Sequence, residues 1–288
     1  MVKAKKVGAK KQLANTTRKG YFAGLFKWFA SSFVAKPQQL GISIVYDAVY
    51  YTLAILVGML LYLPVKKAFF SVQALMSAAE SVGQALPELT TTATQKLLWS
   101  LGAFVVLLPI ALLFIYTAFK GMVWAVIIGK PSLAAFGKGF YWKFFALNLV
   151  WFVFSLPLFS LLLLFSRYVA VLANSATLAF VLSIVLMLLF LHLLTTMHYS
   201  FAKTQLVGKS LASIFTIGFG KIHRLGPAYV LGLVVFIVWS QVLWRAITAI
   251  GLSPSAQFAL LITIIITPVL AWLRIFASGL IEKESKGA

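Results

Sequence analysis

Long apolar runs, rather than alternating apolar and polar positions, dominate this sequence. A helix needs about 20 mostly apolar residues to cross the hydrocarbon core of a bilayer, which is roughly 30 Å thick. Continuous runs of this kind predict helices, because the strands of membrane barrels alternate apolar and polar positions. The segments that meet the criterion are roughly 41–63, 97–119, 144–166, 176–199, 226–244 and 256–279. We therefore expect an all-α, polytopic membrane helix bundle of about six transmembrane helices.

Residues 65–86 follow a different pattern, in which apolar positions recur every three or four residues between polar ones. The pattern predicts an amphipathic helix outside the membrane that ends before Pro87. One interpretation is a helix that lies on the bilayer or caps the bundle. The other is a docking face for a partner subunit, because the apolar stripe is nearly a heptad repeat. The candidate partner face consists of Val72, Leu75, Ala79 and Val82.

Three short segments, each basic and aromatic, precede the three predicted pairs of spans. They are residues 20–36, 131–143 and 208–224. Gly-Lys-Pro-Ser-Leu-Ala at 129–134 resembles Gly-Lys-Ser-Leu-Ala at 208–212, which is consistent with a threefold repeat of elbow plus helical hairpin. The alternative is convergence, since every linker that rests on an anionic leaflet needs aromatic and basic residues. In both interpretations the aromatic side chains enter the headgroup region and the lysines meet anionic lipid.

Composition and charge agree with a membrane protein and predict its orientation. Of the 288 residues 62% are hydrophobic and 10% are charged, whereas soluble domains are about 25% charged. There are 25 Lys and Arg residues against 5 Asp and Glu residues, a formal charge of +20. With six spans, the Lys and Arg residues on one side are only Lys66, Lys67, Lys96, Arg167 and Arg245. The positive-inside rule places the other side, with both termini, in the cytoplasm, and we expect the plasma membrane.

The expected organisation is one membrane domain with short polar ends. Residues 1–19 form a basic cytoplasmic tail that is too polar to bury a core, and we expect it to be disordered. Residues 20–281 form the single six-span domain, and residues 282–288 form a short cytoplasmic C-terminus.

Few polar side chains lie at membrane depth, where ionisable groups are costly and are functional candidates. The candidate inner-leaflet polar site consists of Asp47, Asn148, His192, Thr195, Thr196 and Arg274. Asp47 is the only acid within a predicted span, so we expect it to pair with Arg274. The histidine and threonines share one face of the fourth span. The set is either an ion or solute site, or a group of interhelical hydrogen bonds with side chains that reach the headgroups.

The sequence carries no defensible catalytic, cofactor or metal motif. It has no cysteine, and five acids leave little for acid–base chemistry. His192 and His198 are six residues apart, so they point to different faces of a helix and make a poor metal pair. Gly208-Lys209-Ser210 lacks the first glycine of a phosphate-binding loop, because Lys203 stands at that position. We therefore expect neither an enzyme nor a bound cofactor.

Prolines near the middle of three spans favour a transport function, because broken helices mark substrate sites in many transporters. These residues are Pro109, Pro157 and Pro268. Proline is also common in membrane helices generally. Our first hypothesis is a non-enzymatic, permease-like membrane component for a solute or lipid. The second is a scaffold or accessory subunit of a membrane complex, with a membrane protein partner or as a homo-oligomer. A third, nucleic-acid tethering by the basic tail, is disfavoured because the tail lacks aromatic residues for stacking.

Overall fold

The computed structural model describes residues 37–82, 87–129, 139–249 and 267–286, and within these ranges the ordered elements are helices. Five of the helices are long and apolar enough to cross a membrane. The chain is therefore an all-α membrane protein. The helices are α2 (Pro37–Val82), α3 (Pro87–Ile127), α4 (Phe140–Leu172), α5 (Ala176–Thr204), α6 (Val207–Ser213), the π-helix η2 (Ile214–Phe219), α7 (Ile222–Ala249) and α9 (Thr267–Lys286).

The predicted spans coincide with these helices, and the last one is only partly covered. The first five fall within α2, α3, α4, α5 and α7. The sixth, 256–279, is described from Thr267 onwards as the start of α9, and its first part lies outside the described residues. Of the three predicted elbows, 20–36 and most of 131–143 also lie outside them. The threefold repeat therefore stays a prediction.

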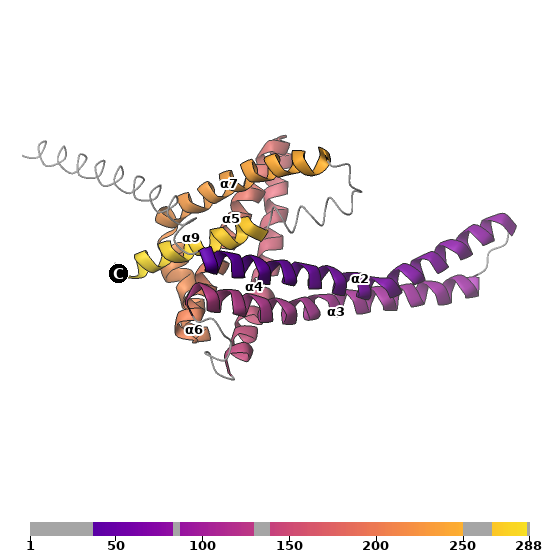
Figure 1. Cartoon of the computed structure of the whole chain (residues 1–288). Coiled ribbons are helices and arrows are strands. Elements are labelled where there is room, and N and C mark those ends of the chain that lie inside the picture. The colour runs from indigo at the N-terminus through magenta and orange to yellow at the C-terminus, as the bar shows by residue number, and fades with distance from the viewer. Residues whose placement is uncertain (1–36, 83–86, 130–138, 250–266, 287–288) are drawn as a thin grey trace, which may run out of the picture.

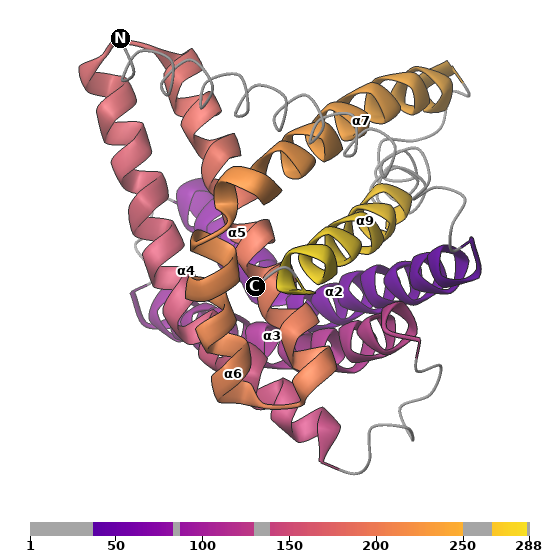
Figure 2. The same cartoon turned by 90° about the vertical axis from the view of Figure 1, so that its left-hand side faces the viewer.

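The long helices pack in pairs that diverge from one another. α2 packs along α3, α4 along α5, and α7 against α9. In Figure 1 the α2/α3 pair extends far from the rest of the molecule, whereas the α4/α5 pair runs across that direction. Figure 2, turned by 90°, shows the α4/α5 pair and α7 rising away from a common centre. The pairs thus meet at one end only.

The buried core lies where the pairs meet, a region that we call the junction. It is formed by residues within 123–127, 140–151, 193–202, 225–229 and 269–281, together with Ile214. Trp124, Phe144, Phe201 and Phe276 are among its fully buried side chains. α9 is buried on most of its faces because it contacts α2, α5 and α7. The packing that holds the helix pairs together is concentrated in this region.

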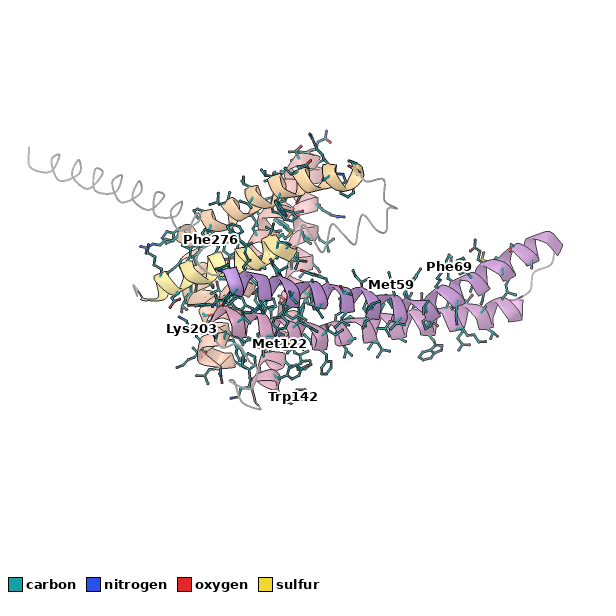
Figure 3. All side chains as sticks on the ribbon, viewed as in Figure 1. Met59, Phe69, Met122, Trp142, Lys203 and Phe276 are labelled. Atoms are coloured by element: carbon teal, nitrogen blue, oxygen red, sulfur yellow. The ribbon has the colours of Figure 1, made fainter. Side chains whose placement is uncertain are left out.

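Away from the junction the helices are largely exposed. At most 22% of the most apolar window of any spanning helix is buried by the rest of the chain. Figure 3 shows the contrast, since Phe276 lies among other side chains while Met59 and Phe69 project from α2 far along the hairpin. Apolar surface of this extent requires lipid or another apolar partner to cover it.

The predicted outer helix is not a separate element, and this corrects its boundary. α2 continues without interruption through Pro64 to Val82. Proline is tolerated within a membrane helix where a neighbouring helix supports the segment, and here α3 packs alongside. Residues 65–82 of α2 and 87–98 of α3 therefore form the far end of one long hairpin. We call this part the distal hairpin.

The apolar stripe of α2 in the distal hairpin packs mainly against α3. Val65 is buried, and Val72 and Leu75, which follow it at helical spacing, are half-buried where α2 packs on α3. The side chains of Ala79 and Val82 lie outside the described set. On the α2 side of the distal hairpin, Phe69, Phe70 and Met76 are each more than half exposed.

The third predicted elbow is helical, but it does not lie apart from the spans. α6 and η2 fold back along the end of α5 and pack against it. Ser210, Ser213 and Ile214 are buried in this contact. Phe215 and Phe219 are exposed and stack on each other with ring centroids 6.1 Å apart. The aromatic side chains of this elbow therefore face outwards, while its small and polar side chains face α5.

Candidate functional site

Three charged side chains from three helices meet in the junction. Asp47 of α2 is completely buried, and its Oδ1 accepts a hydrogen bond from Nζ of Lys120 on α3. Its Oδ2 accepts one from Nη2 of Arg274 on α9. The predicted pairing of Asp47 with Arg274 is confirmed. Lys120 is a member of the cluster that sequence reasoning missed, because it was assigned to a loop after the second span.

Each charged residue lies well inside its helix rather than at an end. At 1.5 Å per residue, Asp47 lies about 15 Å from the start of α2, and Lys120 about 10 Å before the end of α3. α3 continues to Ile127 because the apolar sequence resumes after Lys120. The charge at position 120 interrupts the apolar run without ending the helix. A helix that continues past Lys120 brings its ammonium group within reach of α2.

The rings of three tyrosines lie close to the Lys120 ammonium group. Nζ lies 4.7 Å from the ring centroid of Tyr50 and 5.3 Å from that of Tyr51. The ring of Tyr116 lies 5.9 Å from the same atom. A cation over an aromatic face is stabilised by the ring quadrupole, about 2 kcal/mol when it is desolvated. The lysine is thus held between one carboxylate and several aromatic faces.

A hydrogen-bond chain of three neutral groups lies next to the charged cluster. Nδ2 of Asn148 on α4 donates to Oγ1 of Thr117 at 3.3 Å, and Nε2 of His198 on α5 donates to Oδ1 of Asn148 at 2.7 Å. All three side chains are buried. The ring of Tyr116 lies 6.0 Å from that of His198, so the same tyrosine contacts this chain and Lys120. Residues of α2, α3, α4, α5 and α9 therefore form one connected polar centre.

His192 lies apart from the charged cluster and contacts η2 and α7 instead. Its Nε2 donates to the carbonyl oxygen of Gly218 in η2 at 3.0 Å, and its ring meets that of Tyr229 at 4.9 Å. The approach is close, since a Cβ on Gly218 would come within 2.8 Å of Leu193. π-helical turns often occur at functional sites. The predicted inner-leaflet site groups His192 with Asp47 and Arg274, whereas in the structure His192 contacts the elbow.

The remaining predicted residues are buried on α5. Thr195 and Thr196 are both buried, and in the described part of the chain Oγ1 of Thr196 has no hydrogen-bond partner. The same holds for Oγ of Ser43 and Nη1 of Arg274 within the described ranges. Two of these unsatisfied groups belong to the charged cluster or its vicinity, because Ser43 lies one helical turn before Asp47 on the same face.

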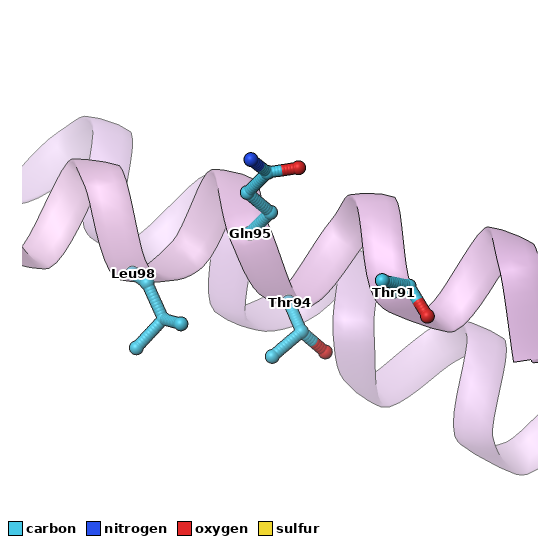
Figure 4. A pocket seen from close by; sticks show the side chains of 4 residues that line it. All are labelled: Thr91, Thr94, Gln95 and Leu98. Atoms are coloured by element: carbon cyan, nitrogen blue, oxygen red, sulfur yellow. The ribbon is translucent and has the colours of Figure 1, made fainter.

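A separate groove lies on the distal hairpin. Figure 4 shows its lining residues, Thr91, Thr94, Gln95 and Leu98, all on α3. Along the helix, Leu98 is about 33 Å from Lys120. The groove is open and formed by one helix, so it offers no convergent set of polar groups. Among the described residues no group of three or more His, Asp and Glu side chains could hold a metal ion.

Comparisons of the chain with models of protein families, with curated proteins and with solved structures find no match. The class to which the chain belongs is defined by its own fold and site. It is a multi-pass helical membrane protein whose hairpins meet at a buried cluster of ionised side chains.

Proposed function

We propose that this chain is a non-enzymatic, transport-type component of the plasma membrane that handles a solute or lipid at the cytoplasmic ends of its spans. One observation carries the proposal. Asp47, Lys120 and Arg274 bring their charges together inside an apolar membrane domain. Ionisable groups at membrane depth are rare and mark substrate, ion or proton pathways.

Stability alone is a poor reason for such a cluster. Taking charges out of water costs several kcal/mol per ion, and a well-packed apolar trio of similar volume is often as stable or more stable. The cluster also continues into neutral polar groups, because Tyr116 joins it to the Asn148–His198 chain. Because this polar centre joins five helices, movement of the helix pairs would change its geometry. This supports its proposed use as a binding site.

The test is transport in liposomes that contain the purified protein. We expect saturable movement of an ionic solute, or of a fluorescent lipid between leaflets, with a rate at least tenfold lower in Asp47→Asn, about 1.4 kcal/mol of lost stabilisation. Gln73→Asn is the matched control, because Gln73 is exposed on the distal hairpin. If neither solutes nor lipids move or bind, the proposal is wrong.

The scaffold function is the second candidate, and one observation favours it. Phe69, Phe70 and Met76 are exposed apolar residues of the distal hairpin, beyond the span predicted over 41–63. Native mass spectrometry in lipid nanodiscs tests it. A second protein at fixed stoichiometry that is lost in Phe69→Lys and Met76→Lys, and kept in Gln73→Lys, would support a subunit of a complex.

A further inference from the structure

We propose that the charged cluster of the junction binds an anion, and that the anion is a phosphate group, carried either by a lipid headgroup or by a soluble phosphate compound. The inference rests on the site of the proposed function and names the chemical class of its ligand. It begins from the charge of the cluster, which holds one carboxylate and two cations.

Among the side chains that the structure describes, Asp47 is the one carboxylate that pairs with the two cations of the cluster. The acids of the chain are Asp47, Glu80, Glu88, Glu282 and Glu284. Asp47 is shared by both cations, and Glu282 pairs with Lys203 at 3.3 Å on the exposed side of α9. Glu284 lies ten residues beyond Arg274 on the same helix, about 15 Å away.

The other two acids belong to the far end of the α2/α3 hairpin. Glu80 is 33 residues from Asp47 along α2, and Glu88 is 32 residues from Lys120 along α3, which correspond to about 50 Å. A buried cation without a counter-charge is strongly destabilising. The tyrosine rings stabilise the Lys120 ammonium group but carry no charge, so we infer that a ligand supplies the missing negative charge.

Hydrogen-bond donors are in place for such a ligand. Nη1 of Arg274 and Oγ of Ser43 are both buried and, within the described residues, have no hydrogen-bond partner. Nη2 of the guanidinium group donates to Asp47, and Nη1 can donate to another oxygen. Ser43 is completely buried one turn before Asp47.

The number and placement of these donors favour phosphate. Arg274, Lys120 and Ser43 come from three different helices, so they would approach an anion from different directions. Phosphate offers at least three acceptor oxygens around one centre and pairs strongly with arginine. The side chain of Arg274 is 13% exposed and therefore reaches the molecular surface, while its Nη1 is buried.

The position of the cluster is compatible with both sources of phosphate. On the opposite face of α2, Val45 is 59% exposed and Val49 is 40% exposed, and both are apolar surface suited to lipid. The cluster thus lies about one helix diameter, roughly 10 Å, from a lipid-facing surface. A lipid headgroup would reach the cluster around α2, along the partly exposed Arg274 side chain, and a soluble phosphate could use the same path.

The variants follow from the charge count. Arg274→Gln leaves Asp47 and Lys120 as a neutral pair, so the protein should fold and lose the anion. Asp47→Asn leaves two cations, so the protein should unfold at a lower temperature without an anion and regain stability with one. Arg245→Gln is the matched control, because Arg245 is exposed on α7. Lys120→Gln serves in place of Arg274→Gln if that variant does not fold.

The experiment measures binding to delipidated protein in a neutral detergent, with two probes in separate arms. One arm titrates inorganic phosphate, and the other titrates a short-chain phosphatidic acid, each followed by thermal unfolding and native mass spectrometry. We expect the wild-type protein and Arg245→Gln to bind at least one probe. We expect Arg274→Gln to bind it at least about tenfold more weakly, as loss of a charge-assisted contact implies.

The two arms identify the source, and the outcomes separate this inference from the proposed function. Binding of the lipid alone assigns a headgroup site, and binding of inorganic phosphate assigns a solute site. Equal affinity in Arg274→Gln and wild-type protein, or no binding of either probe, would overturn the inference. Phosphate binding without any flux in liposomes would instead overturn the transport function and leave the anion site standing.

Discussion

The helices α2 and α3 run through both the junction and the distal hairpin, yet the two regions are stabilised in opposite ways. In the junction, α2 and α3 contribute Asp47 and Lys120 to a buried cluster that α9 completes through Arg274. Figure 1 shows the distal hairpin far from the other described helices, and Phe69 and Phe70 are exposed there. Burial and charge pairing therefore change along a single helix. Long membrane helices need not have one environment along their length.

The largest effect is expected from removing the shared carboxylate. Asp47→Leu leaves Lys120 and Arg274 buried without a counter-charge, and we expect a loss of about 3–5 kcal/mol in the free energy of unfolding. Chemical unfolding in mixed micelles measures it. Gln73→Leu on the distal hairpin is the control and should stay within about 0.5 kcal/mol. Equal stability of the two variants would contradict the contrast between the regions.

The hydrogen-bond chain of the junction gives the next effect. Asn148→Leu leaves His198 Nε2 and Thr117 Oγ1 without their partner, and we expect a loss of about 1–3 kcal/mol by the same unfolding measurement. The double variant Asn148→Leu with His198→Phe should recover part of this loss, because both buried polar groups are then gone. If the stability loss of the double variant equals the sum of the losses of the two single variants, the Asn148 and His198 side chains are not energetically coupled.

A backbone contact in the elbow sharpens the comparison further. A Cβ on Gly220 would lie 2.5 Å from the carbonyl oxygen of Thr216, so Gly220→Ala must shift the backbone after η2. We expect a loss of about 1–3 kcal/mol, as for overpacked sites. Gly226→Ala on α7 is the control, since a Cβ there meets nothing within 4 Å. A loss of stability in Gly226→Ala but not in Gly220→Ala would contradict this prediction.

The smallest effect is expected on the distal hairpin. Phe70 is 54% exposed and Leu98 is 63% exposed, so truncating either to alanine creates no cavity. We expect changes within about 0.5 kcal/mol in the unfolding free energy of the isolated protein. A larger loss would mean that these side chains are covered, for example by a second copy of the chain, and sedimentation in detergent would then reveal an oligomer.

Sequence reasoning found the helices because a continuous apolar run in lipid forms a helix, in which the backbone satisfies its own hydrogen bonds. It also found the Asp47–Arg274 pair, since a single acid within the spans needs a cation. It missed Lys120 because a charge after an apolar run was taken as the end of a span. It separated residues 65–86 from the first span because their apolar positions recur every three or four residues between polar ones.

The sequence by itself determined the all-helical membrane class, the approximate positions of the spans and the scarcity of acids. All three depend on composition and on local apolar runs. Only the tertiary structure decided that the hairpins meet at one end, that α2 passes through Pro64, and that His192 turns to Gly218 rather than to Asp47. These features depend on which helix faces which, and that choice is made by contacts between residues far apart in the chain, such as Asp47 and Arg274.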